Sequence, residues 1–188
     1  MGKDKNNITH RRFAELAKLG EQVFHAGDLA VLWQIDSPNT LYVGLKRYTD
    51  AGLLFRVFKG LYSIKPVHEV DPVLLGMKAI HRYAYISTET VLVRHGVIMQ
   101  AVQAITMISS ISKTFKLADH HYRCRRLSNS SLYDKVGIEL AAKINVASLE
   151  RAVADMLHFK PGYHFDNPKA IHWDKVKKIQ QHLGYVVT

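Results

Sequence analysis

The sequence is poor in cysteine, in acidic residues and in long apolar runs. Its 188 residues include one cysteine, Cys124, which excludes an internal disulfide and suits a reducing compartment. No apolar run approaches the roughly 18 residues that a membrane-spanning helix needs, and residues 1–7 contain no apolar stretch typical of a secretory signal. We therefore expect a cytoplasmic protein that has no membrane partner.

Basic residues outnumber acidic ones in both halves of the chain. There are 26 Lys and Arg residues against 16 Asp and Glu, which gives a formal net charge of +10. Residues 1–66 contribute 10 basic and 6 acidic residues, and the remainder contributes 16 and 10. A polyanion that contacts both halves explains this distribution, because phosphate contacts dominate non-specific nucleic-acid affinity. A basic protein that its charge merely keeps soluble is the alternative.

The most informative segment is a predicted helix that runs into a basic hairpin. Leu41, Leu45 and Tyr48 recur at spacings of four and three, which predicts a helix that buries one face. Gly52 suits the left-handed position just beyond a helix end. The β-branched and aromatic residues that follow predict two strands that turn at Gly60.

The residues before this segment extend it to a small module. The pattern predicts an amphipathic helix at residues 11–19, a strand at residues 23–25 and a helix that starts at residue 26. Helix, strand, helix, turn, helix and hairpin is the order of a winged helix-turn-helix. We therefore predict such a DNA-binding domain at residues 1–66. An ordinary helix and hairpin with surface lysines is the alternative.

The remaining residues, 67–188, predict a mixed α+β domain after a link from Lys65 to Pro72. Ser87 is expected to cap a helix that Gly96 ends, and Ser148 is expected to cap another. Further helices are predicted at residues 73–80 and 174–183, and strands at residues 104–110, 121–127 and 136–146. The fold class that we predict is α+β, with an N-terminal winged helix-turn-helix followed by a C-terminal α+β domain.

Several motifs, in this order, resemble one known family. They include Leu45-Lys46-Arg47-Tyr48, Lys59-Gly60-Leu61-Tyr62, Tyr85-Ile86-Ser87, Ala147-Ser148-x-Glu150-Arg151-Ala152 and Ile171-x-Trp173-Asp174. Together they resemble the AbiEi-type antitoxins of type IV toxin–antitoxin systems, over nearly the whole chain. Leu149 departs from the family, which usually has proline there, and His172 stands where an aspartate commonly precedes the tryptophan.

The resemblance implies a transcriptional repressor that binds operator DNA and represses its own operon. It also implies a second domain that adds basic surface to the DNA and counters a nucleotidyltransferase-like toxin without stable contact. A stand-alone winged-helix regulator of a mobile element, which neutralises no toxin, is the alternative, and a nucleic-acid-acting enzyme is a second one.

The candidate DNA contacts belong to three predicted elements. They are Asn39, Thr40, Tyr42, Val43, Lys46 and Arg47 on the helix, Arg56 and Lys59 on the hairpin, and Arg123, Arg125 and Arg126 on a strand. Asparagine and arginine can read adenine and guanine edges in bidentate fashion. Phosphate contact or plain solvent exposure is the alternative for each. Alternation along a strand places Arg123 and Arg125 on one face and Arg126 on the other.

The sequence supports an enzymatic function less well than DNA binding. The chain has eleven histidines, a residue type common in catalytic and metal sites. His120 and His121, however, are adjacent on a predicted strand and point to opposite faces, so they cannot easily bind one metal together. Cys124 lies among arginines, which would lower its pKa, but it has no identifiable partner base. Arg151 and Asp155 are expected to form ion pairs at a helix surface or between domains. We expect no enzyme and no metal or cofactor.

Overall fold

The computed structural model describes residues 3–188, so the expectation drawn from residues 1–7 lies partly outside it. The chain divides into two compact units, Met1–Asp71 and Pro72–Thr188, and the boundary falls inside the predicted link. Both units combine helices with a β-sheet, so the chain is α+β, as predicted. Across residues 3–188, no helix is long and apolar enough to cross a membrane.

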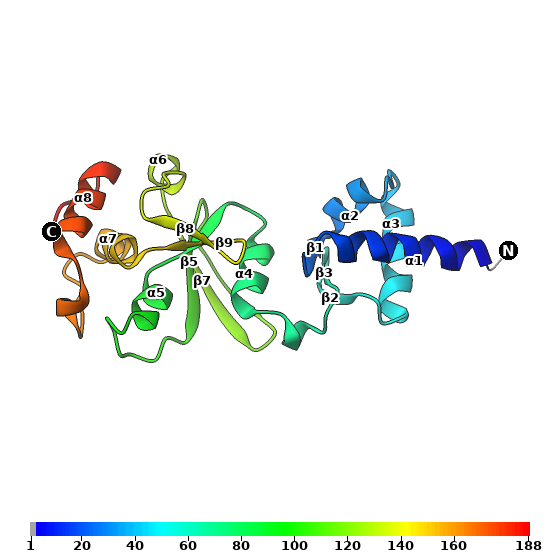
Figure 1. Cartoon of the computed structure of the whole chain (residues 1–188), viewed down its shortest axis with the longest axis horizontal. Helices are drawn as coiled ribbons and strands as arrows, with labels where there is room; N and C mark the ends of the chain where they lie inside the picture. The colour runs from blue at the N-terminus through cyan, green and yellow to red at the C-terminus, as the bar shows by residue number, and fades with distance from the viewer. Residues whose placement is uncertain (1–2) are drawn as a thin grey trace. The chain divides into compact units, whose positions relative to one another are not determined.

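The first unit packs helices against a small antiparallel sheet (Figure 1). Its elements are α1 (Lys3–Lys18), β1 (Val23–His25), α2 (Ala26–Leu32), α3 (Pro38–Asp50), β2 (Phe55–Phe58) and β3 (Leu61–Ser63), followed by the 3-10 turn η1 (Val67–Glu69). The strand order is β1-β3-β2, so the first strand pairs with the far strand of the hairpin. Because α1 already begins at Lys3, the helix predicted at residues 11–19 is the second half of a longer one.

Local signals set both ends of α3. The Ser37 hydroxyl accepts a hydrogen bond from the Thr40 amide at 3.4 Å, and Pro38 occupies the first turn, where its missing N–H costs nothing. Gly52 follows the helix with a φ of 67°, as predicted. The three predicted apolar side chains are buried, and the Tyr48 ring stacks on Trp33 with centroids 5.1 Å apart. The helix is thereby fixed on one side to the core of the first unit.

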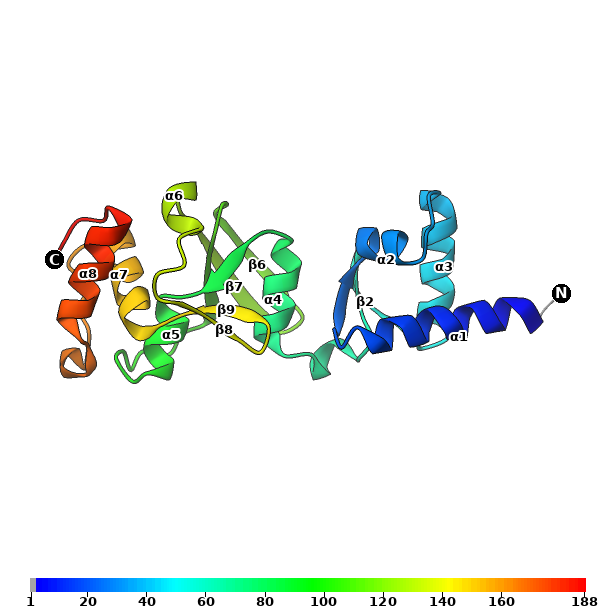
Figure 2. The same cartoon turned by 45° about the horizontal axis from the view of Figure 1, so that its top comes forward.

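The second unit is built on one mixed sheet. Its elements are α4 (Pro72–Ile80), β4 (Ala84–Ile86), α5 (Glu89–Arg94), β5 (Ala104–Ser109), β6 (Lys113–Leu117), β7 (His120–Arg126), α6 (Asn129–Leu132), β8 (Ile138–Ala141), β9 (Ile144–Ala147), α7 (Leu149–Phe159), η2 (Pro168–Ala170) and α8 (Trp173–Leu183). The strand order is β6-β7-β5-β4-β9-β8, in which β5 pairs with β7, and β4 with β9, in parallel. Helix α4 lies on one side of the sheet, α5 and α7 lie on the other, and α8 lies beside α7 (Figures 1 and 2).

Two predictions for the second unit are wrong in detail, and one strand was missed. The single strand expected at residues 136–146 is the hairpin β8–β9, which turns at Ala142 and Lys143 with φ of 47° and 68°. Strand β6 was not predicted. Ser87 does not cap α5, because Thr88 lies between them and the Ser87 hydroxyl donates to Asp155 instead. Ser148 does cap α7, accepting from the Arg151 amide at 3.2 Å.

The expectation of a surface ion pair at Arg151 and Asp155 is also wrong. Both side chains have no exposed surface, and Arg151 Nε donates to Asp155 Oδ1 at 3.0 Å. Tyr85 and Tyr185 donate their hydroxyls to the same carboxylate at 3.0 and 3.1 Å, and Ser87 donates at 2.8 Å. Burial, with Asp155 adding to it, raises the pKa of both phenols, which therefore stay protonated and can donate. We call these five residues the buried polar cluster.

Gly76 is where α4 approaches the sheet most tightly. A Cβ at this position would lie 2.2 Å from Tyr122 Cε1, on a fully buried ring whose hydroxyl donates to the Pro72 carbonyl at 2.9 Å. Because this ring cannot move away freely, Gly76→Ala is expected to lower the free energy of unfolding of the second unit by about 1–3 kcal/mol. Urea denaturation measures the change. Gly44→Ala in α3, where a Cβ meets nothing within 4 Å, is the control and should be stabilising or neutral. An unchanged transition for Gly76→Ala would contradict the close packing.

Candidate nucleic-acid interface

One side of α3 is exposed along its whole length. All six predicted helix residues lie there and are exposed: Asn39, Thr40, Tyr42, Val43, Lys46 and Arg47. Tyr42 and Val43 have 42% and 44% of their surface exposed. The buried side of the same helix packs on the core of the first unit. The helix therefore presents a polar and aromatic surface from a fixed base.

The hairpin β2–β3 lies next to this helix and forms a groove with it. The groove has a volume of about 480 Å³ and is lined by Tyr42, Lys46, Thr49, Asp50, Arg56, Lys59 and Tyr62. The two predicted hairpin residues, Arg56 and Lys59, are both exposed and both belong to this lining. The groove itself could not be predicted from the sequence, because its two walls come from separate elements that only the fold brings together.

Two of the lining residues, both on α3, form an ion pair. Lys46 Nζ lies 2.7 Å from Asp50 Oδ2, one helical turn further along α3. Among residues 10–188, whose side chains the structure describes, the ion pairs include none for Arg47, Arg56 or Lys59. Burial raises the pKa of the Tyr62 phenol, although Arg56 opposes the shift. Tyr62 thus contributes a protonated hydroxyl next to the cations.

The three strand arginines are not equivalent. Arg123 and Arg125 share a face of β7, as predicted, and both reach Glu89 at the start of α5. Arg125 forms a hydrogen-bonded ion pair with Glu89 Oε1, and its guanidinium lies 5.4 Å from the centre of the Phe159 ring. Arg123 is 4.0 Å from the same oxygen and keeps half of its side chain exposed. Arg126 is exposed. Only Arg123 and Arg126 therefore offer much surface to a phosphate.

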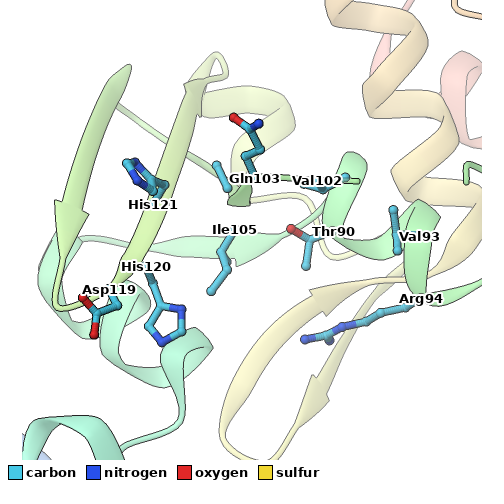
Figure 3. Close-up of a pocket in the computed structure, with 10 residues that line it drawn as sticks. Thr90, Val93, Arg94, Val102, Gln103, Ile105, Asp119, His120 and His121 are labelled. Atoms are coloured by element: carbon cyan, nitrogen blue, oxygen red, sulfur yellow. The ribbon is translucent and has the colours of Figure 1, made fainter. Parts of the chain in front are cut away.

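The histidines considered for catalysis line a different cleft, of about 330 Å³. Asp119 borders it from the β6–β7 turn, His120 and His121 border it from the start of β7, and Arg94 borders it from the end of α5 (Figure 3). The two imidazoles project in different directions from the strand (Figure 3). Among the residues that the structure describes, no group of three or more His, Cys, Asp or Glu could hold a metal ion.

Cys124 is buried, and the pKa of its thiol is shifted in the opposite direction to the one expected from the neighbouring arginines. The side chain points into the core of the second unit, and its thiol contacts the Ile111 carbonyl oxygen at 3.3 Å. Burial raises the pKa of the Cys124 thiol to about 11, so the expectation of a lowered pKa is wrong. The flanking arginines alternate to the other face of the strand and do not reach the sulfur.

We expect Cys124 to react with a thiol reagent at pH 7.5 at a rate on the order of 100-fold lower in the folded chain than in guanidinium, because the thiolate is the reactive form. Stopped-flow absorbance of the released chromophore measures both rates. Equal rates in the two conditions would contradict the burial of the thiol.

Comparison with known proteins bears on the fold alone. No protein-family model matches the chain, and no curated protein matches it. Among solved structures, the chain is similar to the crystal structure of the RV2827C protein from Mycobacterium tuberculosis, with a TM-score of 0.56 and 11% sequence identity. The match covers 93% of this chain and 71% of that one. At this identity the similarity shows a shared fold and gives no information about the function of this chain.

Proposed function

We propose that the chain is a sequence-specific DNA-binding repressor whose first unit is a winged helix-turn-helix. The observation that carries this proposal is the two-sided character of α3. Leu41, Leu45 and Tyr48 fix one side to the core, while the other side exposes six residues beside a basic hairpin. The element order α1, β1, α2, α3, β2, β3 and the strand order β1-β3-β2 support the assignment of β2–β3 as the wing.

In this proposal α3 enters the major groove, which is wide enough for an α-helix. Asn39 lies in the first turn and Arg47 in the last, about two turns apart, so the two reach bases at different positions along the groove. Arg56 and Lys59 on the hairpin contact the sugar–phosphate backbone and fix the register of the helix. Arg123 and Arg126, which lie on opposite faces of β7, are the candidate phosphate contacts of the second unit, in keeping with the basic excess of the second half.

The resemblance to AbiEi-type antitoxins supports a narrower proposal. In it, the repressor acts on its own operon, and the second unit counters a nucleotidyltransferase-like toxin encoded beside it. Co-expression with such a neighbouring reading frame tests this part alone. Relief of growth arrest by the full chain supports an antitoxin. Persistent arrest favours a stand-alone regulator and leaves the DNA-binding proposal intact.

DNA binding is tested with the full chain and a labelled duplex from the region immediately upstream of its gene. A shuffled duplex of the same length and composition is the control. Fluorescence anisotropy at 150 mM salt is expected to give an affinity at least about 1,000-fold higher for a duplex that holds the operator, because specific sites exceed non-specific ones by that much or more. Equal affinities for the two duplexes would contradict sequence-specific binding.

A further inference from the structure

The groove between α3 and the hairpin has the composition of a phosphate site. Three cationic side chains line it, from Lys46, Arg56 and Lys59, together with Tyr42 and Tyr62, whose hydroxyls can donate. Thr49 also lines the groove, but its hydroxyl already donates to the Lys46 carbonyl at 2.7 Å. Ammonium, guanidinium and hydroxyl groups are the donors that hold phosphate oxygens in protein–DNA interfaces. The Tyr62 side chain is 4% exposed, so its position at the groove is fixed by the core.

One group in the lining does not suit a phosphate. Asp50 places a carboxylate in the groove and holds Lys46 through the 2.7 Å contact. Both side chains are largely exposed, at 74% for Lys46 and 61% for Asp50, so water and salt screen the pair and it breaks at small cost. The carboxylate would also repel any phosphate that came to rest beside Lys46.

We propose that this groove receives one phosphate of the DNA backbone and that Asp50 weakens the contact by competing with that phosphate for Lys46. The inference rests on the proposed DNA binding. Because a phosphate is the same at every base pair, Asp50 lowers the affinity for all sequences and so keeps non-specific binding low. Base contacts from α3 then decide at which sequence the chain stays bound.

The test is the pair of variants Asp50→Asn and Glu15→Gln. Glu15 lies on α1, outside the groove lining, and pairs with Arg11 at 3.8 Å, four residues before it. Each variant removes one negative charge from an exposed helical ion pair in the same unit, so the two match in net charge. Circular dichroism confirms that both remain folded.

Anisotropy is measured on the upstream and the shuffled duplex between 50 and 300 mM salt. Asp50→Asn is expected to tighten binding to both duplexes by about five- to tenfold at low salt, and to steepen the slope of log affinity against log salt by up to about 0.9, the share of one phosphate. Glu15→Gln is expected to change affinity by less than about twofold, since its charge lies outside the groove.

A third variant tests the groove independently of Asp50. Tyr62→Phe removes one hydroxyl from the lining, changes no charge and keeps the buried ring. It should weaken binding to both duplexes by about threefold, as expected for the loss of one neutral hydrogen bond. An unchanged affinity for Tyr62→Phe would place the phosphate elsewhere and overturn the site.

The remaining outcomes separate the inference from the proposed function. If the wild-type chain binds DNA but Asp50→Asn and Glu15→Gln have the same effect, the role of Asp50 is overturned and DNA binding stands. If Asp50→Asn weakens binding to the upstream duplex alone, Asp50 contacts a base and the inference is also overturned. If the wild-type chain binds neither duplex, the proposed function fails and the inference fails with it.

Discussion

Replacing Asp155 with alanine is expected to lower the free energy of unfolding of the second unit by about 3–5 kcal/mol, because it leaves the buried Arg151 charge without its partner. Both charges are fully buried, so water cannot replace the lost carboxylate. The hydroxyls of Tyr85, Ser87 and Tyr185 lose their common acceptor in the same step. Each buried donor left without a partner adds its own penalty.

Tryptophan fluorescence can report this change unit by unit, because Trp33 lies in the first unit and Trp173 in the second. In a Trp33→Phe background, urea denaturation followed at Trp173 measures the second unit. Asp134→Asn is the matched control, since Asp134 pairs with His182 at 2.8 Å in a partly exposed position. Asp134→Asn should lower the free energy of unfolding of the second unit by less than about 1 kcal/mol. Equal losses for the two variants would contradict a buried ion pair.

Replacing Arg47 and Lys59 together with alanine is expected to weaken binding to the upstream duplex by about 100-fold at 150 mM salt, with the larger share from the Arg47 base contact. Arg47 is exposed on α3, and Lys59 is exposed on the hairpin. If Lys59 neutralises one phosphate, its loss makes the slope of log affinity against log salt shallower by about 0.9. If Arg47 also neutralises a phosphate, the slope becomes shallower by up to twice that amount.

The matched control for this pair is Lys175→Ala with Lys178→Ala. These two lysines are exposed on α8 in the second unit, so the control removes the same charge from the chain. Its effect on affinity should stay within about threefold, because neither lysine lies on α3, the hairpin or β7, the elements proposed to contact DNA. If the two double variants lose the same affinity, the loss reflects net charge and the assignment of α3 and the hairpin is wrong.

The elements predicted correctly from sequence are those with strong local signals. Helix α3 has a cap at Ser37, apolar residues at helical spacing and Gly52 beyond its end. The hairpin that follows turns at Gly60, which has a φ of 90°. Helix α7 begins at the Ser148 cap. In each case the residues that decide the structure lie within a few positions of one another.

The elements that were missed lack such signals. The β8–β9 turn uses Ala142 and Lys143 in the left-handed region, with none of the Asn-Gly or Asp-Gly pairs that mark tight hairpins. Strand β6 (Lys113–Leu117) lies at the edge of the sheet and carries two lysines among five residues. Charged residues blunt edge strands and also hide them from an apolar pattern.

The contacts of the candidate sites depend on partners that are distant in sequence. Tyr85 and Asp155, which share a buried hydrogen bond, are 70 residues apart, and Arg125 and Glu89 are 36 apart. Arg151 and Asp155 were expected at the surface because charged residues are almost never fully buried unless paired. The pairing is visible only in the fold. By contrast, the exposed set on α3 follows from helical spacing, so its composition could be predicted.

The most direct measurement is an NMR titration of the isotope-labelled full chain with the upstream duplex. We expect the largest amide shift changes at residues 38–50 and 55–63, which form α3 and the hairpin, and smaller changes along β7 around Arg123. Large changes confined to residues outside α3 and the hairpin, or none at all at saturating duplex, would contradict the proposal that this helix and hairpin bind DNA.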